Sequence, residues 1–179
     1  MPKKEFKETK KIVLMGLDNS GKSSIVLCLK GVKNLSSFTA IKPTRGFEIN
    51  NFLALNSEFN IWDFGGQEKF REDYFKNFDN HIKGASKLIY VLDIQDRERY
   101  DISIEYLAQI IMLLRKFKIY SEFSLFLHKF DPDMEILEKE NKDEIIQKLI
   151  KKIGDLIPPD FPYQVYKTSI YTVFQKMLL

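Results

Sequence analysis

A glycine-containing run near the N-terminus has the residue types and spacing of a phosphate-binding loop. It reads Gly-Leu-Asp-Asn-Ser-Gly-Lys-Ser from Gly16 to Ser23, which is the pattern G-x-x-x-x-G-K-[ST]. Glycines let the backbone close around phosphate oxygens, and the backbone N–H groups then point at a common centre. In this pattern the lysine reaches the β- and γ-phosphates and the hydroxyl ligates Mg²⁺. The predicted phosphate-binding residues are Asp18, Asn19, Ser20, Gly21, Lys22, Ser23 and Ser24.

A second run, Trp-Asp-Phe-Gly-Gly-Gln-Glu over 62–68, carries groups that could act on a bound phosphate. Asp63 lies at the end of a predicted strand, where it could hold Mg²⁺ through the water shell of the ion. The glycines allow the backbone N–H of Gly66 to approach a γ-phosphate. Gln67 could then orient an attacking water. We predict Gln67 as the catalytic residue of this segment.

Alternating strands and helices would position these residues. Short β-rich runs predict strands, a helical stripe of apolar residues predicts helices, and 47–55 and 58–64 form a predicted hairpin. The predicted strands are 11–15, 47–55, 58–64, 87–92, 124–127 and 164–166; the predicted helices are 23–30, 102–117 and 134–153, with a loop at 31–46. Such alternation indicates an α/β fold with a mostly parallel sheet and helices on both faces. Ligands bind such sheets beyond the carboxyl ends of the strands.

Length and composition limit the classes of protein that fit. A chain of 179 residues suits one domain, and we predict a single domain over 1–179 with a basic tail at 1–10. The 28 Lys and Arg against 25 Asp and Glu are too balanced to indicate nucleic acid. The single cysteine, Cys28, excludes an intrachain disulfide and a Cys-rich metal site. No stretch approaches the ~20 apolar residues of a membrane span. We therefore expect a cytoplasmic protein.

The motifs together resemble the small GTPases of the Ras superfamily. The phosphate loop combined with W-D-x-G-G-Q is similar to the Arf and Rag branches. Asp18 and the segments 42–47 and 96–99 look Arf-like, whereas 127–131 and 167–171 look Rag-like. The resemblance covers nearly the whole chain and implies a P-loop NTPase G domain with a six-stranded sheet. It does not decide between the two branches.

The resemblance also directs attention to His128-Lys129-Phe130-Asp131, which follows a predicted strand where a base-reading loop is expected. A carboxylate can accept hydrogen bonds from the ring N–H and the 2-amino group of guanine, whereas adenine leaves it unpaired. The Lys129 stem can pack on the base plane. Family members commonly carry Asn at the first position, and His stands here as in Rag-like members. The predicted guanine-reading residues are His128, Lys129, Asp131, Ser169 and Ile170.

Further roles come only from the resemblance. It implies that Thr44 senses the γ-phosphate and Mg²⁺, so the implied metal set is Ser23, Thr44 and Asp63. It implies binding of GTP and GDP with Mg²⁺, slow hydrolysis, and partner affinity that changes through two switch segments. The implied partners are an activating protein, effectors and a second G domain, with no nucleic acid and at most indirect attachment to an internal membrane. We expect a short C-terminal helix, no dimerisation domain and no Arf-type N-terminal helix, and each of these would depart from the family pattern.

Two other classes remain open at this point. One is an interaction module that binds a guanine nucleotide without cycling and acts in a heterodimer; absence of turnover would favour it. The other is an ATP-using phosphotransferase built on the same loop; equal competition by ATP and GTP would favour it. Asp131 argues against the second class, because its carboxylate has no partner on adenine.

Overall fold

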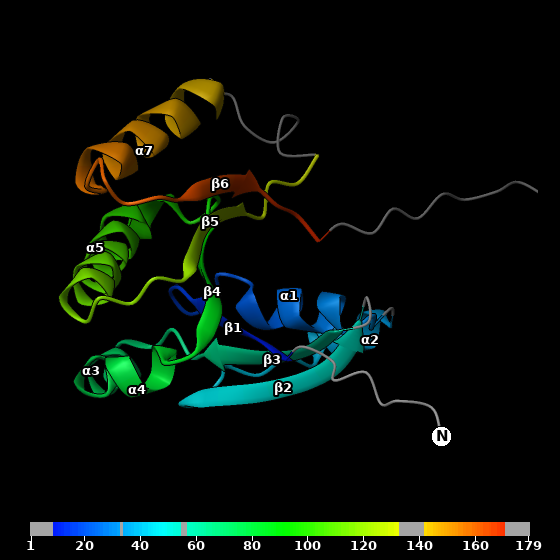
Figure 1. The fold of residues 1–179 in the computed structure, drawn as a ribbon. Coiled ribbons are helices and arrows are strands. Elements are labelled where there is room, and N and C mark those ends of the chain that lie inside the picture. The colour runs from blue at the N-terminus through cyan, green and yellow to red at the C-terminus, as the bar shows by residue number, and fades with distance from the viewer. Residues whose placement is uncertain (1–8, 33, 55–56, 133–141, 171–179) are drawn as a thin grey trace, which may run out of the picture.

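The computed structural model describes residues 9–32, 34–54, 57–132 and 142–170 (Figure 1). Six strands form one sheet in the order β2-β3-β1-β4-β5-β6. Strand β1 pairs in parallel with β3 and β4, and β5 pairs in parallel with β4 and β6. Strands β2 and β3 form the antiparallel hairpin. The predicted fold class, a mostly parallel six-stranded sheet, is therefore confirmed.

The strands lie where the sequence places them, with somewhat different ends. They are β1 (Thr9–Met15), β2 (Phe47–Ala54), β3 (Ser57–Phe64), β4 (Ala85–Asp93), β5 (Glu122–His128) and β6 (Gln164–Lys167). β1 begins inside the range 1–10 that the sequence assigned to a tail, because Thr9 and Lys10 pair with Glu58 and Phe59 of β3. Residues 1–8 lie outside the described part of the chain.

The helices differ more from expectation. They are α1 (Lys22–Leu29), α2 (Leu35–Thr39), α3 (Glu68–Lys76), α4 (Phe78–Ile82), α5 (Tyr100–Lys116) and α7 (Lys142–Leu156), with a 3₁₀ turn η1 (Arg97–Arg99). The range 31–46, predicted to be a loop, contains α2, whose first turn is capped by the Asn34 side chain accepting from Ser36 N at 3.0 Å. The predicted helix 134–153 is described from Lys142 onward, and the expected C-terminal helix lies outside the described residues.

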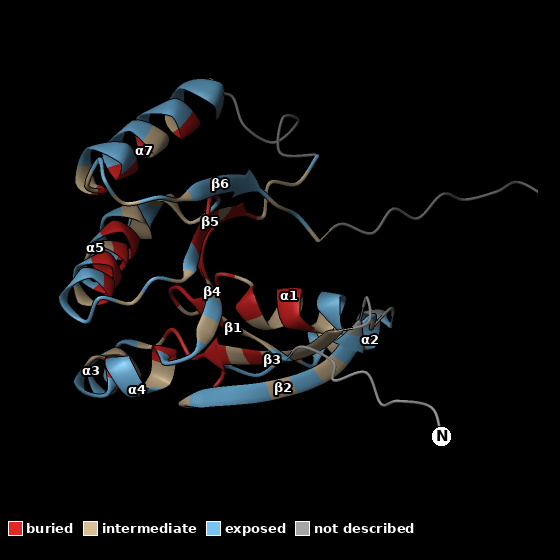
Figure 2. Ribbon diagram, in the orientation of Figure 1, coloured by how far each residue is buried: buried red, intermediate tan, exposed pale blue. Residues whose placement is uncertain are grey.

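Alternate residues of the central strands supply two cores on opposite faces of the sheet. Leu14, Ile89 and Val91 pack with α1 on one face. Val13, Met15, Leu88, Tyr90 and Leu92 pack with α3, α4, α5 and α7 on the other face. Figure 2 shows buried residues on α1 and α5, which cover the sheet, and exposed residues along β2. No helix within the described ranges is long and apolar enough to cross a membrane.

Candidate nucleotide-binding site

The segments that the sequence singled out meet at one edge of the sheet. Four of them follow the carboxyl ends of the parallel strands β1, β3, β5 and β6, and Thr44 reaches the same edge from the segment before β2. The carboxyl ends of parallel strands share an edge, so motifs more than 100 residues apart in sequence become neighbours. This is where a ligand binds in open α/β sheets.

The phosphate loop joins the end of β1 to the start of α1 and curls around the Lys22 ammonium. Lys22 Nζ donates to the carbonyl oxygens of Gly16 at 3.1 Å and Leu17 at 2.6 Å, and to Ser20 Oγ at 3.3 Å. The side chain is buried, and that burial lowers the pKa of Lys22 to about 8. The loop thus holds a buried cation whose described hydrogen-bond partners are all neutral, an arrangement that suits an incoming phosphate.

Three oxygen-bearing side chains from separate segments lie together beside this loop. Ser23 Oγ donates to Asp63 Oδ2 at 2.5 Å and lies 3.2 Å from Thr44 Oγ1. Asp63 is 1% exposed, and its Oδ1 is buried without a hydrogen-bond partner within the described part of the chain. Burial raises the pKa of Asp63, although the Ser23 hydroxyl and the Lys22 charge oppose that rise.

The orphaned carboxylate oxygen and two hydroxyls fit a small divalent cation. Mg²⁺ prefers hard oxygen ligands, and it usually keeps several waters and uses substrate phosphates beside one or two carboxylates. The described ranges contain no group of three or more His, Cys, Asp or Glu residues arranged for a metal. The donor set of Ser23, Thr44 and Asp63, two hydroxyls and one carboxylate, suits Mg²⁺ that arrives with phosphates.

The glycines after β3 bring the second motif against the phosphate loop. An ideal Cβ built on Gly66 would lie 2.0 Å from Asp18 N, so only glycine allows this approach. Gly65 N donates to Gly46 O at 2.8 Å, and the Tyr74 hydroxyl donates to the same oxygen at 2.5 Å. These contacts fix the backbone immediately before Gln67.

A cavity of about 420 Å³ lies between these segments. Its walls come from the phosphate loop, from 38–44 and from 65–67; the lining residues are Asp18, Asn19, Gly21, Lys22, Ser23, Ser24, Phe38, Ile41, Lys42, Pro43, Thr44, Gly65, Gly66 and Gln67. Sequence reasoning missed Phe38 and Ile41, since nothing in the local pattern distinguishes them from core residues. Together with Pro43 they form an apolar wall of the cavity.

The base-reading loop, residues 128–131 (the base loop), contacts the phosphate loop through His128, whose ring lies against Gly21. The His128 ring is 3% exposed, and its Nδ1 lies 2.9 Å from Thr168 Oγ1. Phe130 N donates to Thr168 O at 3.0 Å, which ties the loop to the segment after β6. Burial, followed by the Lys129 charge, lowers the pKa of His128, so the ring is neutral at neutral pH.

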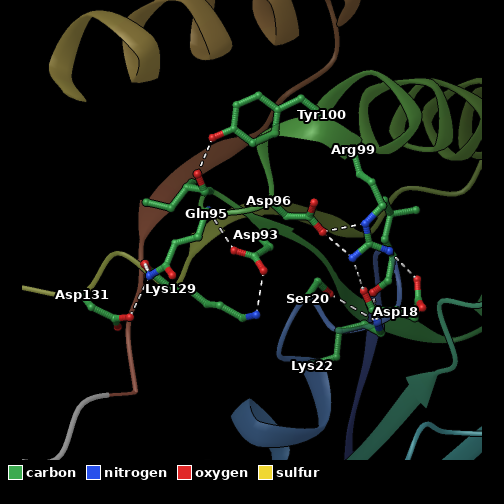
Figure 3. Close-up of polar contacts among 12 residues, drawn as sticks. Asp18, Ser20, Lys22, Asp93, Gln95, Asp96, Arg99, Tyr100, Lys129 and Asp131 are labelled. Atoms are coloured by element: carbon green, nitrogen blue, oxygen red, sulfur yellow. Dashed lines mark hydrogen bonds and ion pairs between the residues drawn. The ribbon is translucent and has the colours of Figure 1, made fainter. Parts of the chain in front are cut away.

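Lys129 and Asp131 are held by residues at the end of β4 and just after it (Figure 3). Asp131 accepts hydrogen bonds from the Ser169 hydroxyl and from Gln95 Nε2, the latter at 2.9 Å. Lys129 Nζ pairs with Asp93 at 2.7 Å, and Gln95 Nε2 also donates to Lys129 O at 2.8 Å. The structure therefore brings Lys129, Asp131 and Ser169 together around Gln95, and their role in reading guanine stays a prediction.

Some residues of this arrangement were missed or lie differently. Asp93 and Gln95 were missed, because their contacts reach across 34–36 residues of sequence. Arg99, noted only as part of an Arf-like segment, contacts Asp18 of the phosphate loop. Ile170 is partly buried against the core on the α1 face of the sheet.

Fold and site together define a phosphate-binding α/β domain of the G-protein class. The family model described as "Gtr1/RagA G protein conserved region" matches residues 11–175. The chain belongs to this family of small GTPases, and the predicted Arf- or Rag-like assignment is confirmed.

Individual relatives support both branches of the resemblance. The chain is 28% identical to the GTP-binding protein GTR1 of Saccharomyces cerevisiae over 94% of its own length and 56% of that protein. It is 39% identical to ADP-ribosylation factor-like protein 2 of Arabidopsis thaliana over 55% of its length and 49% of that protein. The chain thus spans about half the length of these relatives.

A solved structure shares the fold. It is described as the Arl6 BBS3 small GTPase from Trypanosoma brucei with bound nucleotide analogue GppNp. The TM-score is 0.67 and the identity 23%, and the match covers 90% of this chain and 87% of that chain.

Proposed function

We propose that this protein is a guanine-nucleotide switch that binds GTP and GDP with Mg²⁺, hydrolyses GTP slowly and changes its partner affinity between the two states. The observation that carries the proposal is the cluster of Ser23, Thr44 and Asp63. It joins the phosphate loop, the segment before β2 and the end of β3 within 3.2 Å. A nucleotide bound there would place its phosphates against the segment before β2 and the end of β3 at the same time. The order of both segments would then depend on the bound phosphates, which is how nucleotide state controls a partner-binding surface.

Each residue has a defined task in this proposal. The Lys22 ammonium and the backbone N–H groups of the phosphate loop hold the phosphates, and Ser23, Thr44 and Asp63 hold Mg²⁺. Bound Mg²⁺ would neutralise charge on the phosphate oxygens. Gln67 orients the attacking water, because the contacts of Gly65 and Gly66 hold the backbone of Gln67 beside the cavity. The described site offers positioning and charge neutralisation, so hydrolysis without a partner is slow.

Base recognition falls to the loop after β5. Asp131 can accept from the N1–H and 2-amino groups of guanine while keeping its bond from Gln95, since a carboxylate has about four lone-pair sites. His128 places this loop against the phosphate loop. The backbone of Ser169 and Ile170 would donate to the guanine O6.

The two switch segments also define the proposed partners. An activating protein and effectors would bind the surface formed by 38–46 and 65–76, because a γ-phosphate would order both. A second G domain as dimer partner, a cytoplasmic location and attachment to an internal membrane through partners are further proposals from the Rag resemblance.

The test begins with the nucleotide. The protein is purified with Mg²⁺ and denatured, and the released nucleotide is identified by ion-exchange chromatography. GDP or GTP near one per chain supports the proposal. Failure to bind added labelled GTP, or competition by ATP equal to that by GTP, overturns it.

The rate of GTP hydrolysis then distinguishes a switch that cycles between GTP and GDP from a module that binds the nucleotide without cycling. Gln67→Leu should lose hydrolysis and keep nucleotide binding. Gln109→Leu is the matched control, because Gln109 is exposed on α5 away from the site. Equal turnover in Gln67→Leu and the control would refute the water-positioning role. No turnover in the parent protein, even with candidate activators, would indicate the non-cycling module.

A further inference from the structure

We propose that Arg99 is a positioning residue that neutralises the Asp18 carboxylate and holds it off the phosphates, so that the site accepts a triphosphate. This inference rests on the proposed function. It concerns discrimination between GTP and GDP, to which the predicted γ-phosphate contacts of Thr44 and Gly66 also contribute.

The Arg99 guanidinium contacts an acidic residue on each of its two sides (Figure 3). Its Nη1 pairs with Asp18 Oδ1 at 2.8 Å, and its Nη2 donates to the Asp18 backbone oxygen at 3.3 Å. The opposite side of the guanidinium is fixed by Asp96, which accepts from Nε at 2.6 Å and also pairs with Nη2. The planar fork is therefore oriented by Asp96 and directed at Asp18.

The negative charge of the Asp18 carboxylate disfavours phosphate binding. It is the single acidic residue between Gly16 and Ser24, and it lines the nucleotide cavity. A free carboxylate there would repel phosphate oxygens, and the repulsion would grow with each added phosphate charge. At a few ångströms near a protein surface such a repulsion weakens binding by about tenfold or more.

The Arg99–Asp18 pair lies on the side of the loop that faces Gln67. Asp18 and Gln67 both line the nucleotide cavity and a second cavity of about 670 Å³, which Arg99 also lines. Gly66 packs against the Asp18 backbone nitrogen from the same side. Under the proposed function this is the γ-phosphate side, so an unmasked Asp18 would weaken GTP more than GDP.

The Arg99–Asp18 pair contributes little to the stability of the fold. The Arg99 and Asp18 side chains are 32% and 46% exposed, and ion pairs with such exposure contribute little to stability. Loss of Arg99 should therefore act on nucleotide affinity, with little change in the urea midpoint of unfolding. Arg115, which pairs with Asp160 at 3.2 Å at the far end of α5, provides a matched surface pair outside the site.

The experiment measures dissociation constants for GDP and for a non-hydrolysable GTP analogue, both with Mg²⁺. The proteins are the parent, Arg99→Ala, Arg115→Ala and the double variant Asp18→Asn with Arg99→Ala. We expect Arg99→Ala to weaken the GTP analogue about tenfold relative to GDP. The double variant, which has no carboxylate left to mask, should return the ratio to within about threefold of the parent. Arg115→Ala should keep the parental ratio.

The outcomes separate this inference from the function on which it rests. Equal weakening of GDP and the GTP analogue in Arg99→Ala would show a merely structural role. Failure of the double variant to restore the ratio would show that Asp18 is not the group being masked. A parent protein that binds neither nucleotide would overturn the proposed function itself, and this inference with it.

Discussion

The imidazole ring of His128 lies directly on Gly21 of the phosphate loop. A Cβ on Gly21 would lie 2.5 Å from His128 Cδ2 and 2.7 Å from Nε2. Gly21 also has φ +93°, a conformation that side chains rarely adopt. The base loop and the phosphate loop are thus in contact through a histidine and the one residue type that leaves room for it.

Gly21→Ala should therefore destabilise the protein by overpacking as well as by strain. Gly31→Ala is the matched control, because Gly31 has φ +77° and nothing lies within 4 Å of its Cβ position. We expect Gly21→Ala to lower the free energy of unfolding by ~1–3 kcal/mol more than Gly31→Ala, measured by urea unfolding without nucleotide. Equal losses would mean that the His128 contact contributes nothing beyond backbone strain.

Stability should also fall on mild acidification because of His128. Burial holds the pKa of His128 below its usual 6.5, so the unfolded chain binds the proton first as the pH falls. The free energy of unfolding should decrease from about pH 6.5 downward, by at most ~1.4 kcal/mol per pH unit for this group. His128→Asn should reduce that slope. His81, whose pKa burial also lowers, keeps its own share, so the slope should not vanish. Identical slopes would contradict this assignment.

Much of the fold could be predicted because its signals are local. The buried strands β1, β4 and β5 are short apolar runs, and the stripe Ile104, Leu107, Ile111 and Leu114 of α5 is buried as its spacing predicts. Helix α2 could not be predicted from periodicity, because five residues give no stripe. Its one local signal is Asn34, a common capping residue.

The candidate site divides in the same way. The phosphate loop and W-D-x-G-G-Q are contiguous in sequence, so their residues could be named in advance, whereas Thr44 and the base loop were named only through the family resemblance. The residues that hold them in place could not be named. Arg99 meets Asp18 across 81 positions, and His128 meets Thr168 across 40. Such contacts depend on strand order, which the local pattern does not specify.

Phosphate binding should weaken above about pH 8 because Lys22 must carry its charge. Burial lowers the pKa of Lys22 to about 8, so the free protein loses this proton within an accessible range. We expect the affinity for GDP to be level near pH 7 and to fall toward tenfold per pH unit above pH 8. A constant affinity up to pH 9 would show that Lys22 remains charged.

Base specificity should invert when the Asp131 acceptor becomes a donor. Asp131→Asn presents an amide N–H where guanine presents its 2-amino group, so two donors meet. Xanthine carries a carbonyl oxygen at that position and can accept instead. We expect GDP to bind about 10–100-fold more weakly and XDP to bind better than GDP. Competition against a labelled nucleotide measures both, and unchanged preference for GDP would place base recognition outside Asp131.

Gly66→Ala should separate the switch segment from the phosphate loop. A Cβ at Gly66 would meet the backbone of Asp18 and Leu17 at 2.0 Å, and backbone cannot move aside as a side chain can. Overpacking of this kind costs ~1–3 kcal/mol, or the segment shifts and Gln67 leaves the cavity.

Gly154→Ala in α7 is the opposite case and serves as the control. Its Cβ would meet only the Tyr163 hydroxyl, at 3.9 Å, within the described residues. Alanine in a helix interior loses less chain entropy on folding than glycine, so this variant should gain ~0.5–1 kcal/mol. Urea unfolding and single-turnover hydrolysis together decide the point. Gly66→Ala should fall below the parent in at least one of them, and parental behaviour in both would show that the glycine contact with Asp18 is not maintained in solution.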